Sequence, residues 1–279
     1  MDISWQQATE LLASQRLDVL TLLNATEAAL SREAIDEGRR RTVVHGWPAR
    51  HYLRYQNGQL THYAQADLTA RPTIEMNGGG IDEALLTLLL GEFEQVHWWT
   101  RGGEDSDFPR GTVMRKLLLL SVDLPVTVEV IPENSVLRPF EPTRDEDAWL
   151  VQNNEAFANH PEQGAWLRAD LAQRTMEPWF DPSGFLLLEI DGRLSASCWT
   201  KIHELHPDRF GEIYVISVHP DFQGRNLGKV MVTQGMDSLR RKGVKRCVLF
   251  VDETNEGARR LYGQLGFQLV REDRLFRFS

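Results

Sequence analysis

The stretch VHPDFQGRNLGKVMV, residues 218–232, decides the expected fold. It runs from the end of an apolar strand through a proline and a short loop with Gln223, Gly224 and Arg225 into an amphipathic helix that ends at Gly243. Backbone N–H groups in the first turn of a helix lack intrahelical partners, and the helix dipole favours a negative ligand by about 0.3–1 kcal/mol. The stretch therefore predicts a cradle for a phosphate group. A glycine at a strand-to-helix turn can also serve the turn alone, so the surrounding elements decide between the two readings.

Strands and helices alternate around this loop. Residues 186–199, LLLEIDGRLSASCW, form a predicted β-hairpin whose Asp191–Gly192 turn suits positive φ angles. Residues 211–220 are a third strand that ends at a proline. The elements expected downstream of the long helix are a strand at 245–252, a helix at 255–266 and a final pair of strands at 267–272 and 274–279. This order predicts an α/β fold of the α+β type with a mixed sheet.

The first half of the chain repeats the same order in a weaker form. Its expected elements are a hairpin at 51–66 turning at Asn57–Gly58, a strand at 72–76, a helix at 81–93, and strands at 94–100 and 111–122. Three glycines at 78–80 lead almost directly into the helix, so the phosphate loop has no counterpart here. We therefore expect two tandem domains, residues 1–130 and 144–279, joined by a proline-containing linker at 131–143. The first domain should be a degenerate copy of the second.

Charge and composition limit the classes of binding partner and the cellular compartment that we expect for this protein. A net charge of -9 argues against a nucleic-acid partner, which would require a basic face. No apolar run approaches the roughly 20 residues of a membrane span, and residues 1–20 lack the pattern of a signal peptide, so we expect a cytoplasmic protein without a membrane partner. Cys198 and Cys247 lie in apolar stretches typical of buried strands. His203 and His206 are expected in a polar loop. The histidines form no metal-ligand pattern, so we expect no metal. We also expect the protein to be a monomer.

The phosphate loop resembles that of the GNAT acetyltransferases. The family's acyl-CoA loop has the form Q/R-x-x-G-x-G/A between a strand and a helix, and Gln223, Asn226, Leu227 and Gly228 occupy matching positions. Asn226 stands where the family usually has glycine. Because Asn is the next most tolerant residue of left-handed backbone geometry, the loop conformation is expected to survive.

A second GNAT signature follows downstream, namely an Asn at a strand end, a helix bearing a Tyr, and a Gly-Phe pair. Asn255, Tyr262, Gly266 and Phe267 supply it. Asn255 and Tyr262 are two helical turns apart and can face one cleft, although a lone Tyr on such a helix could also be a core aromatic. The resemblance implies acetyl-CoA as co-substrate, with Tyr262 protonating the departing thiolate. The implied acetyl-CoA-binding residues are Ile216, Ser217, Val218, Gln223, Gly224, Arg225, Asn226, Leu227, Gly228, Lys229, Asn255, Glu256, Gly257, Ala258, Arg259 and Arg260.

Direct acetyl transfer to an amine needs a base for the ammonium proton, donors for the oxyanion and an acid for the thiolate. Glu212 opens the strand before the loop and is the candidate base, acting directly or through one water. It could equally be a solvated strand-end carboxylate. Backbone N–H groups around residues 216–218 would face the thioester, because the strand must splay from its neighbour to admit it. A ping-pong route through an acetylated cysteine is disfavoured, since neither cysteine has a His beside it in the sequence.

Residues 151–166 and 177–189 resemble the mycothiol synthase family, actinobacterial tandem GNAT enzymes that acetylate the cysteinyl amine of cysteinyl-glucosaminyl-inositol in the last step of mycothiol biosynthesis. The likeness covers most of residues 136–279 and is faint before them. It implies that cysteinyl-glucosaminyl-inositol is the small-molecule partner of this chain.

The same resemblance implies substrate-binding roles for Glu162, Lys201 and Glu212, and a weaker one for Glu33 in the first half. Without the resemblance, these side chains would be ordinary loop, helix or strand-end charges. We expect no tight acetyl-CoA site in the first half. Two alternatives stay open, a GNAT enzyme acting on another small-molecule or peptide amine, and a non-catalytic acetyl-CoA sensor.

Overall fold

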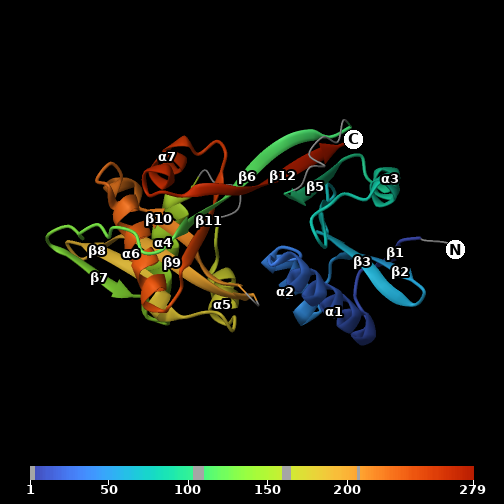
Figure 1. The fold of residues 1–279 in the computed structure, drawn as a ribbon, viewed down its shortest axis with the longest axis horizontal. Helices are drawn as coiled ribbons and strands as arrows, with labels where there is room; N and C mark the ends of the chain where they lie inside the picture. The colour runs from blue at the N-terminus through green and yellow to red at the C-terminus, as the bar shows by residue number, and fades with distance from the viewer. Residues whose placement is uncertain (1–3, 103–109, 159–164, 206–207) are drawn as a thin grey trace.

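The computed structural model of the chain describes residues 4–102, 110–158, 165–205 and 208–279. One mixed sheet runs through both halves, with the strand order β1-β2-β3-β4-β5-β12-β6-β11-β10-β9-β8-β7 (Figure 1). The elements of the first half are β1 (Gln6–Ala8), α1 (Ala13–Leu30), α2 (Glu37–His45), β2 (Arg50–Gln56), β3 (Gln59–Ala66), β4 (Thr73–Met76), α3 (Glu83–Glu92), β5 (Val96–Arg101) and β6 (Thr112–Asp123). Those of the second half are β7 (Ser135–Pro139), α4 (Glu146–Ala156), α5 (Arg168–Thr175), β8 (Phe185–Ile190), β9 (Arg193–Leu205), β10 (Asp208–Val218), α6 (Leu227–Arg241), β11 (Arg246–Asp252), α7 (Glu256–Gln264) and β12 (Gln268–Phe278).

The two halves share one pattern of strands and helices. In the first, β2, β3 and β4 pair antiparallel, and α3 then crosses over to the parallel neighbour β5. In the second, β8, β9 and β10 pair antiparallel, and α6 crosses over to the parallel neighbour β11. The mixed α/β fold and the repeat expected from the sequence are therefore confirmed.

Two long strands tie the halves together. β6 belongs to the first half of the sequence but pairs along its length with β11, from Asp123 opposite Arg246 to Leu117 opposite Asp252. β12 lies between β6 and β5, so the end of the chain pairs with the first half (Figure 1). Its Phe276 and Phe278 pack in the same core as Trp98 of β5. Each half thus contributes a strand to the sheet of the other.

Helices cover both faces of the second half of the sheet. α6 and α7 cover one face, where Met231 and Leu239 of α6 pack on Cys198 and Leu249. α4 and α5 cover the opposite face, where Trp149 packs among Phe185 and Trp199. Successive side chains of a strand point to opposite faces, so β8 and β11 carry unbroken apolar runs, residues 185–188 and 247–251.

Three expectations differ from the structure. The final strand pair is wrong: β12 is one strand, because Asp273, expected at a break, is buried within it and accepts two hydrogen bonds from Arg271, at 2.6 and 3.0 Å. His203 lies in β9 and not in a polar loop, while His206 lies outside the described residues. The predicted linker 131–143 contains β7, which pairs with β8 as the edge strand. The domain boundaries themselves stay a prediction.

Candidate active site

The central feature of the site is a gap between two parallel strands. β10 pairs with β11 only at Gly211 and Glu212, and beyond Glu212 it continues beside β9 alone. The splay expected from the sequence is therefore present, and alternate N–H groups of β10 point away from β9 into it. A cavity of about 690 Å³ opens here and is lined by the β10 segment 212–218 and by Gly228, Asn255 and Tyr262.

A β-bulge in β10 controls which side chains face which side. The register with β9 shifts between Ile213 and Val215, so Tyr214 is the additional residue. Ile213 packs on the α6 face, and Val215 packs on the α4 face. Glu212, which precedes Ile213, points to the side opposite α6, where the connector between α1 and α2 approaches.

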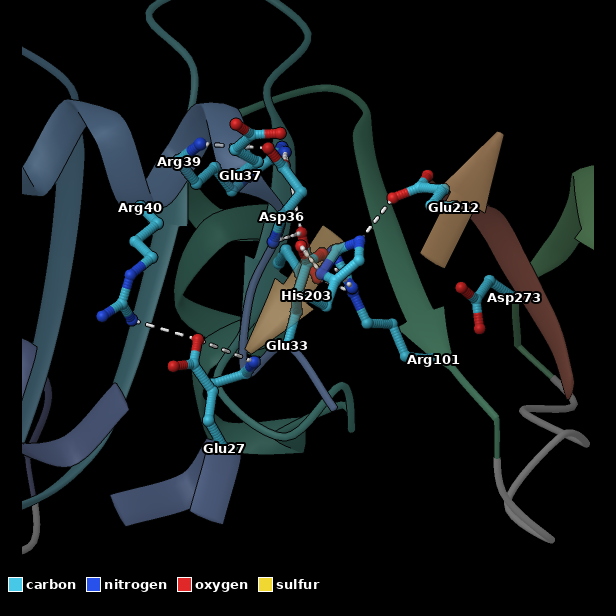
Figure 2. Close-up of polar contacts among 12 residues, drawn as sticks. Glu27, Glu33, Asp36, Glu37, Arg39, Arg40, Arg101, His203, Glu212 and Asp273 are labelled. Carbon is cyan, nitrogen blue, oxygen red and sulfur yellow. Dashed lines mark hydrogen bonds and ion pairs between the residues drawn. The ribbon is translucent and has the colours of Figure 1, made fainter. Parts of the chain in front are cut away.

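On this side Glu212 meets a histidine. Its side chain is 11% exposed, and its Oε2 lies 2.6 Å from Nε2 of His203 on the neighbouring strand β9. Nδ1 of His203 lies 3.9 Å from Oε1 of Glu33 in the α1–α2 connector. Figure 2 shows His203 between the two carboxylates, one from each half of the chain. Sequence reasoning missed His203 because the alternation along 193–205 was read as ending before it.

Lys201 also joins the two halves. Its Nζ donates to Oε2 of Glu37 at 3.1 Å and lies 3.6 Å from Glu33. The ammonium also lies over the ring of Trp179, 4.9 Å from its centroid, and Trp179 Nε1 donates to Oε1 of the same Glu37 at 2.7 Å. Glu37 and Trp179 are site residues that the sequence did not single out. Trp179 lies within the resembled segment 177–189, whereas no signal in the sequence marks Glu37.

The opposite charges around Glu33 and Lys201 stabilise each other's ionised forms. Burial raises the pKa of Glu33, but the nearby cations Lys201 and Arg101 and the ring of His203 together lower it more, so the net shift is downward. Burial lowers the pKa of Lys201, but Glu33, Glu212 and Glu37 raise it well above its ordinary value. The Glu33 carboxylate and the Lys201 ammonium therefore remain charged at neutral pH and can bind polar or charged ligand groups.

The loop before α6 has the geometry expected of a phosphate cradle. Gly224 has φ +77°, and Asn226 has φ +61° and ψ +14°, both left-handed. Asn226 thus adopts the conformation that the sequence required of it. It is the N-cap of α6, yet its side chain makes no capping hydrogen bond, so the first-turn N–H groups are left to water or a ligand. Arg225 stacks over Phe222, at 5.1 Å, which holds its cation beside the loop.

Asn255 and Tyr262 line the same cavity from α7. The carboxamide oxygen of Asn255 accepts from the N–H of Ala258 at 3.1 Å, so its NH₂ group is the part able to bind a ligand. Tyr262 is 6% exposed, and burial raises its pKa above the ordinary value, so the hydroxyl remains protonated at neutral pH. Within the described part of the chain, no hydrogen bond engages that hydroxyl.

The remaining expected residues are spread more widely. Glu162 lies outside the described residues. Glu256, Arg259 and Arg260 line a different cavity of about 440 Å³. Lys229 is paired with Glu129, with 2.6 Å between Nζ and Oε1. The larger cavity does bring together Glu33, Lys201, Glu212, Ile216, Ser217, Val218, Gly228, Asn255, Ala258 and Tyr262.

The corresponding position of the first half is closed. β4 pairs with β5 up to Glu75, as β10 does up to Glu212, but Glu75 is ion-paired with Arg101. The N–H of Arg101 then donates to the carbonyl of Gly79 at 3.0 Å, which bridges the gap. At the start of α3, Asp82 accepts from the N–H of Leu85 at 2.9 Å. A carboxylate thus occupies the position at which α6 offers free N–H groups.

Within the described ranges, no group of three or more His, Cys, Asp or Glu side chains is arranged to hold a metal ion. None of the helices described there is long and apolar enough to cross a membrane.

The sheet with its splay after Glu212 and the loop leading into α6 define an acetyltransferase of the GNAT class, and the Acetyltransferase (GNAT) family matches residues 147–267. Mycothiol acetyltransferase of Streptomyces griseus subsp. griseus is 35% identical over 285 residues, covering 95% of this chain and 92% of that protein. Mycothiol acetyltransferase of Thermobispora bispora is 36% identical over 282 residues, covering 93% and 94%. A tandem GNAT protein from the clavulanic acid biosynthesis pathway shares the fold, with a TM-score of 0.70 at 13% identity over 98% of both chains. The chain belongs to the mycothiol acetyltransferase family and is an acetyl-CoA-dependent acetyltransferase.

Proposed function

We propose that this enzyme transfers the acetyl group of acetyl-CoA directly to the cysteinyl amine of cysteinyl-glucosaminyl-inositol, the last step of mycothiol biosynthesis. The observation that carries the proposal is that one cavity of about 690 Å³ is lined by a buried carboxylate, Glu212, by the splayed strand beyond it and by a protonated phenol, Tyr262. These are the base, the oxyanion donors and the acid that the reaction needs.

The residues divide the chemistry as follows. Glu212, directly or through one water, takes a proton from the cysteinyl ammonium and leaves the amine free to attack the thioester carbon. N–H groups of the splayed segment 216–218 donate to the oxygen on which negative charge develops. Tyr262 gives its proton to the departing CoA thiolate. The left-handed loop at Gly224 and the uncapped first turn of α6 support a role in holding the CoA pyrophosphate.

A ping-pong route through a cysteine is disfavoured by burial. Cys198 and Cys247 are free thiols with no exposed surface. Burial raises the pKa of Cys198 to about 12 and that of Cys247 well above its ordinary value. A thiol must ionise to attack a thioester, so neither is available at neutral pH. Free buried thiols are also consistent with a reducing compartment, which we propose is the cytoplasm.

The acceptor suits the charges that face Glu212. The proposed substrate carries one ammonium and many hydroxyls, which match carboxylates and one cationic donor. Glu33 and Lys201 are close to Glu212 and supply both kinds of group, and Glu33 brings the first half of the chain into the substrate site. We propose the same role for Glu162.

We propose that the first half contributes to substrate binding but neither binds acetyl-CoA tightly nor catalyses transfer. The Glu75–Arg101 ion pair and the Asp82 cap of α3 occupy the places that the base and the phosphate would need.

The test is the rate of acetylated product, followed by mass spectrometry because the acceptor itself carries a thiol. Glu212→Gln should lower kcat by about 10²–10⁴-fold, the usual contribution of a general base, with little change in acetyl-CoA affinity. Tyr262→Phe should lower kcat as well. Glu204→Gln on the neighbouring strand is the control, because Glu204 is exposed and, among the described residues, forms its ion pair with Arg209 alone. Unchanged kcat in both the Glu212 and Tyr262 variants would contradict the proposed roles.

A further inference from the structure

His203 is a buried histidine whose neighbours are those of a functional group. Its side chain is 9% exposed, and its ring stacks on Phe210 with centroids 4.6 Å apart and planes 11° apart. The edge of the ring faces carboxylates on both sides, Glu212 at 2.6 Å from Nε2 and Glu33 at 3.9 Å from Nδ1. The stack fixes the ring plane, with Nε2 in contact with Glu212 and Nδ1 on the side of Glu33 (Figure 2).

The contact with Glu212 fixes the position of a proton. The proposed role of Glu212 as a base requires an ionised carboxylate, which can only accept, so in this proposal Nε2 of His203 carries the hydrogen between the two groups. A hydrogen bond of 2.6 Å to a charged acceptor belongs to the strong class. It holds Oε2 of Glu212, and Oε1 is the oxygen left to accept a proton from a substrate.

His203 contacts Glu212 from a cavity other than the one that Tyr262 lines. His203 lines a second cavity, of about 510 Å³, together with Glu33, Glu212 and Arg246. Glu33 and Glu212 also line the larger cavity in which we place the acetyl transfer, whereas His203 is not one of its described lining residues. Glu212 therefore lies between the two cavities, and His203 contacts it from the cavity of about 510 Å³.

We propose that His203 is a positioning residue for Glu212: its Nε2–H fixes one carboxylate oxygen so that the other meets the substrate ammonium. Glu33 lies 3.9 Å from Nδ1, which places a carboxylate of the non-catalytic first half beside the base of the second. This inference rests on the proposed role of Glu212 as general base. His203 itself contacts neither substrate.

Two substitutions separate this role from packing. His203→Gln keeps an amide N–H at a reach similar to that of Nε2 but loses the aromatic stack. His203→Phe keeps the stack on Phe210 but has no donor. Positioning predicts that the Gln variant retains most of kcat, whereas the Phe variant loses about 10- to 100-fold, the usual effect of one hydrogen bond to a charged group. The KM for acetyl-CoA should not change in either variant.

The experiment measures kcat and both KM values for the wild type, these two variants, Glu212→Gln and the double variant Glu212→Gln/His203→Phe. His51→Phe is the control for loss of a buried histidine hydrogen bond, since His51 bonds Tyr63 at 2.7 Å in the first half. It should lower the thermal midpoint without changing kcat. In the double variant His203→Phe should add no further loss, because His203 acts through Glu212.

The outcomes distinguish the two proposals. If Glu212→Gln is impaired but His203→Phe is fully active, or if the Phe variant works better than the Gln variant, His203 has no positioning role while the proposed function stands. Additive losses in the double variant would also overturn it. If Glu212→Gln keeps full kcat, the proposed base is wrong, and the role of His203 is overturned with it.

Discussion

Replacing Gly224 with alanine is expected to weaken acetyl-CoA binding through the backbone alone. Gly224 has φ +77°, and a methyl group added there would meet no atom within 4 Å, so no steric contact contributes. An L-residue in this left-handed conformation costs about 1–2 kcal/mol. If the free loop relaxes to another conformation, binding must restore the original one, and the Kd for acetyl-CoA rises by about 5- to 30-fold.

The assay is calorimetric titration with acetyl-CoA, with urea unfolding to report stability. Gly58→Ala is a matched control: Gly58 has φ +79°, a methyl group would also meet nothing within 4 Å, and its turn joins β2 and β3 in the first half. It should lower the free energy of unfolding by about 1–2 kcal/mol with no change in Kd. Unaltered affinity in the Gly224 variant, or equal weakening in both variants, would refute a ligand-binding role for the loop.

Three further predictions concern the rest of the fold. Asp82→Ala should lower the free energy of unfolding by at least about 1 kcal/mol in urea titrations and should leave kcat unchanged, since it removes the N-cap of α3 and the carboxylate that pairs with Arg54 and accepts from Trp5. Burial raises the pKa of Asp36, but Arg39 and Arg101 lower it more, so the net shift is downward. The ionised carboxylate therefore stabilises the fold above its unfolded pKa of about 3.9, and this stability is lost as the pH falls below that value. Asp36→Asn keeps a capping side chain for α2 and should show a shallower loss of unfolding free energy on acidification below about pH 4. Cys198→Ala should keep its turnover, because burial raises the pKa of that thiol to about 12, and complete loss of turnover in a folded variant would revive the ping-pong route.

Local features of the site were predictable because they depend on neighbours in the sequence. The Asp191–Gly192 turn has φ +51° and +75°, as a two-residue hairpin requires. Asn226 has a left-handed φ, and this follows from its place before a helix and from the tolerance of Asn for that conformation. The splay after Glu212 was expected for a different reason, the need to admit the thioester that the resemblance implied.

Features that depend on pairing between distant segments were not predictable. Nothing local in β12 indicates that it pairs with β5 and β6, which is why its centre was taken as a break between two strands. The link of His203 to Glu33 depends on how the α1–α2 connector approaches β9, and two segments about 170 positions apart carry no shared pattern. Glu33 itself could be suggested only by the resemblance, and it lies in the connector and not on a helix.

The acceptor preference tests the central claim most directly. At saturating acetyl-CoA, kcat/KM would be measured for cysteinyl-glucosaminyl-inositol, for glucosaminyl-inositol without the cysteine, for spermidine and for a peptide with a free N-terminal alanine. We predict that the cysteinyl conjugate exceeds each of the others by at least about 100-fold, because only it can fill the contacts with Glu33 and Lys201 while presenting its amine to Glu212. Equal or better turnover of the polyamine or the peptide, or tight acetyl-CoA binding with no turnover of any amine, would contradict it.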